Sequence, residues 1–364
     1  MNTLPAPPPT DHQAIALLTD LVATPSPSHH EGEAVACCVR WMRSLGLCAE
    51  VDGAGSAVGT LGEGPRQIVL LGHIDTAPGW VPVQRSGDLL YGRGSVDAKG
   101  PLAAFVVAAA RAGALAGVQT VVVGAVEEEC ATSAGARHAL TRYRPDCVVI
   151  GEPSGWDRVT LGYKGRLLID CRLSRPMTHT AGQERGACEQ AVDAWLRVAA
   201  WAAAYNQDKE GVFGALDVSL RDIRSSSDGL TEQVEMTIAL RTPPGLDAQP
   251  LLDTLAQRPA DSSTQVALHT HGHEAPFRAE KRTPLVSAFL AAIRAAGSRA
   301  ALVNKTGTSD MNVVGPVWAC PIVAYGPGDS QLDHTPHEHI DLHEYLASIR
   351  VLTDVLVRLG GTLR

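Results

Sequence analysis

The sequence predicts an α/β catalytic domain with a mostly parallel central sheet, interrupted by a smaller inserted α+β domain. Two observations lead to this fold class. Between residues 57 and 152, apolar runs typical of buried strands alternate with segments of helical spacing, which indicates a parallel sheet covered by helices. From about residue 162 the order changes to strand, helix, strand, strand, helix, strand, which is a compact split βαβ unit of the ferredoxin-like kind. The α/β pattern resumes near residue 283, and residues 343–359 form a helix with one apolar face.

Each element follows from its local pattern. In the first part, helical spacing covers residues 11–22, 31–46, 99–115 and 133–143. Strand-like apolar runs there cover residues 57–61, 67–75, 120–128 and 147–152. In the insertion, strands are predicted at 165–174, 215–223, 232–241 and 264–273, with helices at 187–205 and 247–257. We therefore expect the catalytic domain to comprise 1–161 and 276–364, and an inserted lid and dimerisation domain to comprise 162–275.

The composition of the chain excludes several classes of function. At 364 residues and 45% hydrophobic, the chain can bury a core in each of two domains. Its net charge of −8, with both signs interspersed, leaves no basic surface for nucleic acid. No apolar run reaches the length of a membrane span, and the first residues lack the features of a signal peptide, so we expect a cytoplasmic protein without membrane contact. The eight cysteines form no CxxC pair, which fits buried thiols in a reducing compartment.

Side chains that bind metals occur at or near the ends of the predicted strands. His73 and Asp75 are two positions apart in "VLLGHIDTAPG" and would share one face of their strand. Further candidates are Asp97, the three glutamates at 127–129, Glu152 and His334. Any one of these carboxylates alone would be interpreted as a helix cap or a surface ion pair. Together, at one edge of one sheet, two imidazoles and several carboxylates suit two zinc ions about 3.5 to 4 Å apart.

The motifs "GHIDTAP", "GRGSVDAKG", "VEE", "GEP" and "HTPHE", in this order, resemble those of the dinuclear zinc aminoacylases, carboxypeptidases and desuccinylases. The resemblance implies an amide hydrolase with two zinc ions per subunit, cobalt being an alternative metal. It assigns the metal ligands as His73, Asp97, Glu128, Glu152 and His334, with Asp97 bridging the two ions. It also implies that Asp75 accepts the second ring N–H of His73 and that Glu127 is the general base.

The three consecutive glutamates leave two assignments open. Aligning the aliphatic strand with that of the family makes Glu127 the base and Glu128 the ligand. A shift by one residue would make Glu128 the base and Glu129 the ligand. The first assignment is favoured here, because a one-residue shift along a strand turns its side chains to the opposite face.

The insertion adds two candidates. Its motifs "GYKG", "PMTHTAG" and "IALRTPPG" also resemble the family. The resemblance implies that His179 reaches the active site of the neighbouring subunit of a homodimer, where it stabilises the tetrahedral oxyanion, and that Arg241 binds a carboxylate of the substrate. Without the resemblance, His179 would be interpreted as an exposed turn residue.

Within the family, "GEPSGW", "NKTGTSDMN" and "GPGDSQLDHTPHEHI" look most like the hydrolases that release lysine or ornithine from the γ-glutamyl C-terminus of an amino-group carrier protein. That resemblance implies a role in lysine or arginine biosynthesis, with the loaded carrier as partner. One alternative is a deacylase of small substrates, such as acetylornithine or succinyl-diaminopimelate. Another is a binding module of the same fold without catalysis, although the complete set of ligands and a base disfavour it.

Overall fold

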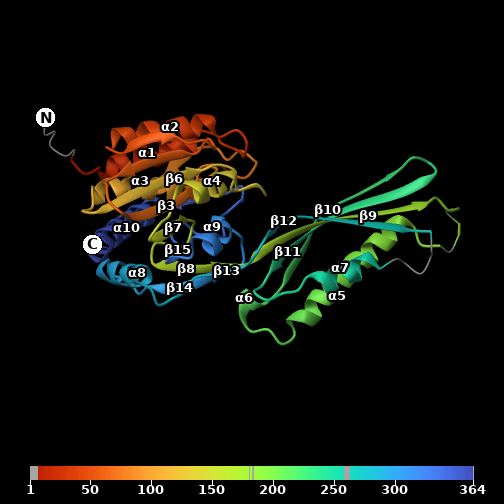
Figure 1. The fold of residues 1–364 in the computed structure, drawn as a ribbon. Coiled ribbons are helices and arrows are strands. Elements are labelled where there is room, and N and C mark those ends of the chain that lie inside the picture. Colours follow the sequence, from red (N-terminus) through yellow and green to blue (C-terminus); the bar gives the residue numbers. More distant parts are fainter. Residues whose placement is uncertain (1–6, 180, 183, 258–262, 364) are drawn as a thin grey trace. The chain divides into compact units, whose positions relative to one another are not determined.

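The computed structural model describes residues 7–179, 181–182, 184–257 and 263–363 (Figure 1). The chain divides into two compact units. The larger unit comprises Met1–Gly162, Arg278–Asn304 and Ser309–Arg364, and the inserted unit comprises Tyr163–Phe277 and Lys305–Thr308. The sequence predicted one continuous insertion, at 162–275. The short return segment Lys305–Thr308 was not predicted, because four residues are too few to carry a pattern.

A nine-stranded sheet forms the centre of the larger unit. Its strands are β1 (Cys48–Val51), β2 (Ala57–Leu61), β3 (Arg66–His73), β6 (Val118–Ala125), β7 (Cys147–Gly151), β8 (Arg158–Tyr163), β13 (Phe277–Arg278), β14 (Ala301–Lys305) and β15 (Ile322–Ala324). They follow the order β1-β2-β6-β3-β7-β15-β8-β13, and β14 pairs with β8. The four central strands β6, β3, β7 and β15 are parallel, whereas β2 and β8 pair with their neighbours antiparallel. The predicted, mostly parallel central sheet is therefore confirmed, with antiparallel strands towards its edges.

Helices cover both faces of this sheet. They are α1 (Asp11–Ala23), α2 (Gly32–Ser44), α3 (Lys99–Ala112), α4 (Ala134–Arg142), α8 (Pro284–Ala295), α9 (Asp310–Trp318) and α10 (Leu342–Thr362). Helix α3 packs on β3, β6 and β7, and both α1 and α10 pack on α3 (Figure 1). The consecutive β3 residues Ile68 and Val69 point to opposite faces and are both fully buried, as expected for a sheet covered on two sides. No helix within the described residues has the length and apolar character to cross a membrane.

Two central strands end earlier than predicted. The run at 67–75 was predicted as one strand, but β3 ends at His73 and Asp75 lies in the loop that follows. The run at 120–128 was also predicted as a strand, but β6 ends at Ala125. The three glutamates therefore lie in a loop, where the alternation of side chains along a strand no longer determines their direction.

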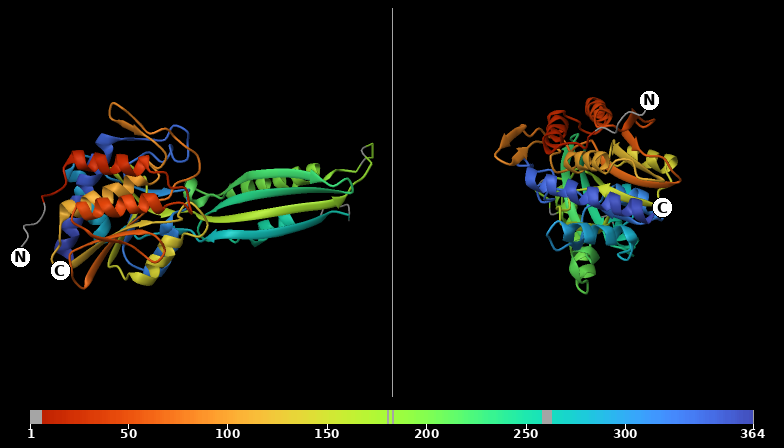
Figure 2. Two further views of the ribbon diagram at one scale, coloured as in Figure 1. Left: turned by 90° about the horizontal axis from the view of Figure 1, so that it is seen from above. Right: turned by 90° about the vertical axis from the view of Figure 1, so that its left-hand side faces the viewer.

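The inserted unit is a four-stranded antiparallel sheet with helices on one face. Its strands are β9 (Gly165–Pro176), β10 (Asp217–Ser227), β11 (Thr231–Thr242) and β12 (Gln265–Glu274), in the order β10-β11-β9-β12. Its helices are α5 (Ala187–Asn206), α6 (Gly211–Gly214) and α7 (Gln249–Ala256). Alternate β9 residues, from Leu167 to Leu173, are buried against α5 and α7. The four strands lie side by side in the left view of Figure 2, and their order along the chain is the predicted one.

A small three-stranded sheet completes the larger unit. It consists of β4 (Gln84–Ser86), β5 (Leu89–Tyr91) and β16 (His339–Asp341), in the order β16-β5-β4. The segment between β5 and α3 carries Asp97, and the loop before β16 carries His334. The pairing of β16 with β5 therefore brings together two segments that are far apart in the sequence.

Candidate metal centre

Two histidines contact opposite oxygens of Asp97. His73, the last residue of β3, has its Nε2 atom 3.2 Å from Asp97 Oδ1. The Nε2 atom of His334 lies 2.9 Å from Asp97 Oδ2. A carboxylate that meets a different imidazole with each of its oxygens has the arrangement of a ligand that bridges two metal ions. The structure thus brings together three predicted ligands, of which His73 and His334 lie furthest apart in the sequence.

One further carboxylate joins each histidine. Glu152 directly follows β7, and its Oε1 atom lies 4.0 Å from His73 Nε2. The Oε1 atom of Glu129 lies 3.0 Å from His334 Nε2 and also accepts a hydrogen bond from the main-chain N–H of Ala77. There are thus two groups that share Asp97, each with one imidazole and two carboxylates, and within each group the ligand atoms lie within 4.8 Å of one another.

The glutamate beside His334 is Glu129 and not Glu128, so the structure differs from the favoured sequence assignment. The carboxylate of Glu127 lies elsewhere, since its Oε2 accepts a hydrogen bond from Thr132 Oγ1 and its Oε1 is 3.3 Å from His29 Nδ1. The physical reason is the early end of β6, followed by a left-handed backbone at Glu127 (φ 63°). The alternative assignment, with Glu128 and Glu129 in the two roles, fits the positions of these side chains.

Asp75 holds the loop that carries the glutamates. Its carboxylate is fully buried and accepts hydrogen bonds from the main-chain N–H groups of Glu128 and Glu129, each at 3.0 Å, and from Ser28 Oγ at 2.8 Å. The Nδ1 atom of His73 lies 3.0 Å from the main-chain oxygen of Asp75 and 3.5 Å from its Oδ1. The sequence suggested only the contact with His73, because the glutamate loop could not be seen as its neighbour.

Glu338 and Lys99 had no predicted role, although both stand in the motifs "HTPHE" and "GRGSVDAKG". The buried carboxylate of Glu338 accepts the main-chain N–H groups of Val96 at 3.0 Å and Asp97 at 3.2 Å, and pairs with Arg93 at 2.7 Å. Lys99 Nζ is buried and donates to the main-chain oxygens of Leu21 and Thr24 at the end of α1. These contacts fix the segment on both sides of Asp97. The final glutamate of "HTPHE" and the lysine of "GRGSVDAKG" were the available signals.

The charged groups of the cluster shift one another's pKa values. Burial lowers the pKa of His73, but its contacts with Asp75 and Asp97 outweigh this, so the pKa lies well above its ordinary value. Hydrogen bonds with Asp97 and Glu129 raise the pKa of His334 to about 10. Burial raises the pKa of Glu128 well above its ordinary value, and the negative charges of Glu152 and Asp310 raise it further. Protons on the two imidazoles therefore offset part of the charge of the surrounding carboxylates.

The two candidates of the inserted unit lie in different settings. His179 is exposed, and its Nδ1 accepts a hydrogen bond from the N–H of Ala181 at 3.1 Å. In the neutral ring, Nε2 then carries the proton and can donate it. Arg241, near the end of β11, is half-buried, and its Nη1 donates to Thr308 Oγ1 at 2.7 Å. Thr308 belongs to the return segment that was not predicted, and the motif "NKTGTSDMN" was the signal for it.

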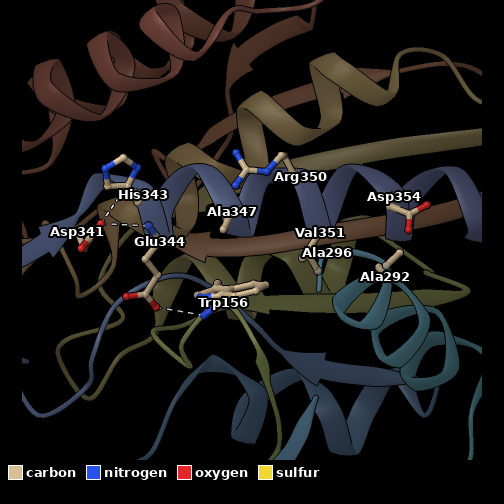
Figure 3. Close-up of a pocket in the computed structure, with 11 residues that line it drawn as sticks. Trp156, Ala292, Ala296, Asp341, His343, Glu344, Ala347, Arg350, Val351 and Asp354 are labelled. Carbon is tan, nitrogen blue, oxygen red and sulfur yellow. Dashed lines mark hydrogen bonds between the residues drawn. The ribbon is translucent and has the colours of Figure 1, made fainter. Parts of the chain in front are cut away.

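A separate cavity of about 780 Å³ lies between α8 and α10 (Figure 3). Trp156 lines it together with Glu344 and Arg350 of α10. The carboxylate of Glu344 accepts the main-chain N–H groups of Trp156 and Gly328, both at 3.1 Å, so it stabilises the surrounding loops. The described residues that line this cavity include none of the predicted metal ligands.

The central sheet is mostly parallel, and imidazoles and carboxylates gather around a shared aspartate beside the ends of its strands. This arrangement defines a metal-dependent amide hydrolase. More particularly, the chain belongs to peptidase family M20/M25/M40, whose model matches residues 69–358. The family predicted from the motifs is therefore confirmed.

Relatives match over nearly the whole chain. The LysW-lysine hydrolase of Deinococcus radiodurans is 45% identical over 362 residues, covering 98% of this chain and 99% of the relative. A protein of Thermococcus kodakarensis with the provisional name LysW-lysine/LysW-ornithine hydrolase is 40% identical, covering 97% and 94%. Among solved structures, the M20 family metallo-carboxypeptidase Sso-CP2 from Sulfolobus solfataricus has a TM-score of 0.76 at 17% identity, covering 95% and 99%. This last similarity shows the fold.

Metal binding should release protons, because metals bind neutral imidazole and both histidines have raised pKa values. At pH 7 we expect about two protons to leave per chain, one from each histidine, and metal affinity to rise with pH up to about the pKa of His334. Calorimetric titration of metal-free protein in two buffers of different ionisation enthalpy measures the number. His334→Gln should release one proton fewer, whereas His343→Gln, at the start of α10, should match the unmodified protein. Heats that do not depend on the buffer would contradict the expectation.

Proposed function

We propose that this protein releases L-lysine, and L-ornithine as a second product, by hydrolysing the amide bond to the γ-glutamyl C-terminus of an amino-group carrier protein of the LysW kind. The observation that carries the proposal is the 45% identity with the LysW-lysine hydrolase of Deinococcus radiodurans over almost the full length of both chains. The provisional name of the Thermococcus relative supports ornithine as the second amino acid. The eight free cysteines fit a cytoplasmic site of action.

For the metal centre we propose that His73 and Glu152 bind one zinc ion, that Glu129 and His334 bind the other, and that Asp97 bridges them. The contacts of the two Asp97 oxygens with different histidines support this division. Nitrogen and oxygen ligands suit zinc, and cobalt accepts the same set. When bound, the two cations would lower the pKa of the attacking water and polarise the scissile carbonyl.

We assign Glu128 as the general base. It would take a proton from the attacking water and pass it to the leaving α-nitrogen of the amino acid. Its position supports the role, because it is the neighbour of Glu129 in the chain and its main-chain N–H is held by Asp75. The raised pKa of its carboxyl group suits a residue that must both accept and donate a proton.

The variants Glu128→Gln and Glu127→Gln separate the two possible assignments. Glu128→Gln should still bind two metal ions and lose turnover by roughly a hundredfold or more, because proton transfer contributes about that much. Glu127→Gln, the matched control one residue earlier, should keep turnover within a few-fold. Steady-state kinetics with metal analysis of both variants gives the answer. Loss of turnover in Glu127→Gln with normal activity of Glu128→Gln would restore the original sequence assignment.

For the substrate we propose that Arg241 binds the free α-carboxylate of the amino acid. The guanidinium group offers parallel donors that match a carboxylate, and Thr308 already fixes its Nη1 atom. A lysine at this position would keep the charge but lose the paired geometry. The shape of the donor group at this position, and not its charge alone, should therefore determine how well the carboxylate binds.

Carrier-linked lysine and N-acetylated amino acids, assayed side by side, should favour the carrier-linked substrate. With that substrate, Arg241→Lys should reduce kcat/KM by about tenfold or more, the value of one charge-assisted hydrogen bond. The same variant should make little difference to an analogue whose α-carboxylate is a neutral amide. Equal losses for acid and amide would mean that Arg241 supports the fold only. Faster hydrolysis of acetylated or succinylated amino acids would favour the small-substrate alternative.

We further propose a homodimer in which His179 stabilises the oxyanion in the partner's site. Two observations support it: the Nε2 atom of His179 is available as a donor, and α5 exposes apolar residues one turn apart, Val192 (48% exposed) and Leu196 (56%). Apolar side chains in such a row favour contact with another chain.

Subunit mixing tests the dimer. Glu128→Gln and His179→Ala should each be inactive. A mixture of the two variants should recover part of the activity, because some mixed dimers would contain one complete active site. Val357→Ala, on the surface of α10, serves as a control for His179→Ala because it should not affect activity. A mixture that stays inactive after verified subunit exchange would exclude the role of His179 across the interface.

A further inference from the structure

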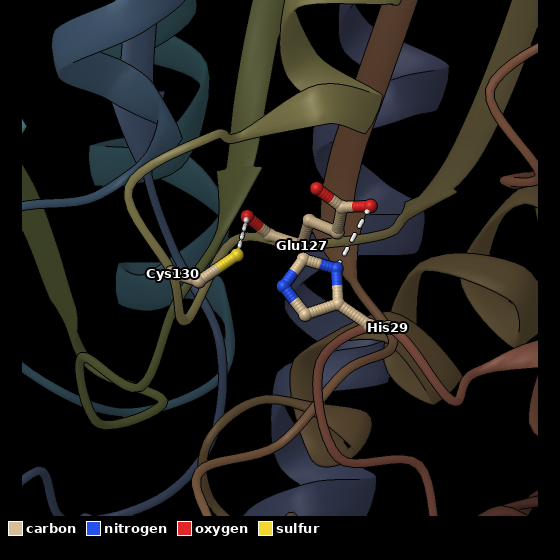
Figure 4. Close-up of side chains that lie close together, drawn as sticks. All are labelled: His29, Glu127 and Cys130. Atoms are coloured by element: carbon tan, nitrogen blue, oxygen red, sulfur yellow. Dashed lines mark hydrogen bonds and ion pairs between the residues drawn. The ribbon is translucent and has the colours of Figure 1, made fainter.

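Three side chains with metal-binding atoms converge outside the centre described above (Figure 4). His29 lies in the loop between α1 and α2, and Glu127 and Cys130 lie in the loop after β6. The Nδ1 atom of His29 is 3.3 Å from Glu127 Oε1, and Cys130 Sγ contacts the main-chain oxygen of Glu127 at 3.4 Å. The imidazole nitrogen, a carboxylate oxygen and the sulfur lie within 4.8 Å of one another.

A buried carboxylate holds the two loops together at this point. Glu31 Oε1 accepts the main-chain N–H of His29 at 2.9 Å and that of Glu127 at 3.2 Å, and Glu31 is only 6% exposed. Both residues that it holds have left-handed backbones, with φ 72° at His29 and 63° at Glu127. Residues other than glycine adopt this conformation rarely, and here it turns the two side chains towards each other. Glu31 therefore fixes the backbone of the cluster at His29 and Glu127 from its buried side.

We propose that His29, Glu127 and Cys130 form a third divalent-cation site, selective for zinc or another borderline-soft ion. One nitrogen, one oxygen and one sulfur ligand match the zinc ligand set and leave a fourth position for water. The imidazole is 60% exposed and the Glu127 side chain 23% exposed, so an ion can reach the cluster from solvent. Small side-chain rotations would bring the three atoms to the usual distances of about 2.0 to 2.3 Å from a common ion.

Charge balance favours a divalent ion. On binding, the thiol of Cys130 loses its proton to solvent, so one thiolate and one carboxylate neutralise the cation while the imidazole stays uncharged. Sulfur sets the site apart from the centre around Asp97, whose groups offer only nitrogen and oxygen. A soft ligand shifts preference towards zinc and cobalt and away from magnesium and calcium. The site has no part in the proposed hydrolysis, so it can be tested on its own.

Cobalt titration followed by absorption spectroscopy tests the site. A thiolate bound to cobalt gives charge-transfer absorption in the near ultraviolet, which nitrogen and oxygen ligands do not give. The first two equivalents of Co²⁺ should enter the centre around Asp97 without this absorption, and a third should produce it. Cys130→Ser should abolish the absorption and reduce the bound metal from three ions to two in equilibrium dialysis. His29→Gln should lower the affinity for the third ion at least tenfold.

Cys48→Ser is the matched control, because Cys48 is an exposed cysteine of β1 outside the cluster. It should keep both the absorption and the third ion. Absorption that persists in Cys130→Ser, or that disappears in Cys48→Ser, would assign the sulfur to another residue and overturn the proposal. A titration that ends at two ions without charge-transfer absorption would overturn it as well, while leaving the centre around Asp97 intact.

Discussion

The buried carboxylate of Asp75 is the interaction on which the rest of the site depends. A charge removed from water is costly unless hydrogen bonds satisfy it. Asp75 obtains its donors from three separate segments: Ser28 before α2, His73 at the end of β3, and the N–H groups of Glu128 and Glu129. These segments must therefore converge whenever the domain folds. Asp75 thus fixes both the orientation of the His73 ring and the position of the loop that carries Glu128 and Glu129.

The same kind of interaction, a buried charge bonded to loop backbone, is made by Glu338, Glu31 and Lys99. Each is a buried charged group whose partners are mostly main-chain atoms of loops that follow strands or helices. The parallel strands decide where the functional side chains gather, and the buried charges decide how they are oriented. Loops at the ends of strands can in this way be as well determined as the sheet itself, even where their backbones adopt the left-handed conformation.

Much of this could be predicted from the sequence. Continuous apolar runs indicated the central parallel strands, and the motifs identified the family and the kinds of residues in the site. The choice among Glu127, Glu128 and Glu129 could not be predicted, because it depends on where β6 ends and on contacts with Asp75 from a distant segment. The strand prediction through Asp75 was wrong for a related reason: its side chain is buried by loop contacts and not by the sheet. Glu338 was visible in a motif, but its contact with the main-chain N–H of Asp97 was not.

The two halves of the centre differ in their access to water. The His73 side chain is 2% exposed, whereas that of His334, which comes from a loop, is 54% exposed. An ion held by His334 would therefore exchange with the medium faster than one held by His73. The inner position would behave as a permanent part of the fold, and the outer one would follow the supply of metal in the cell.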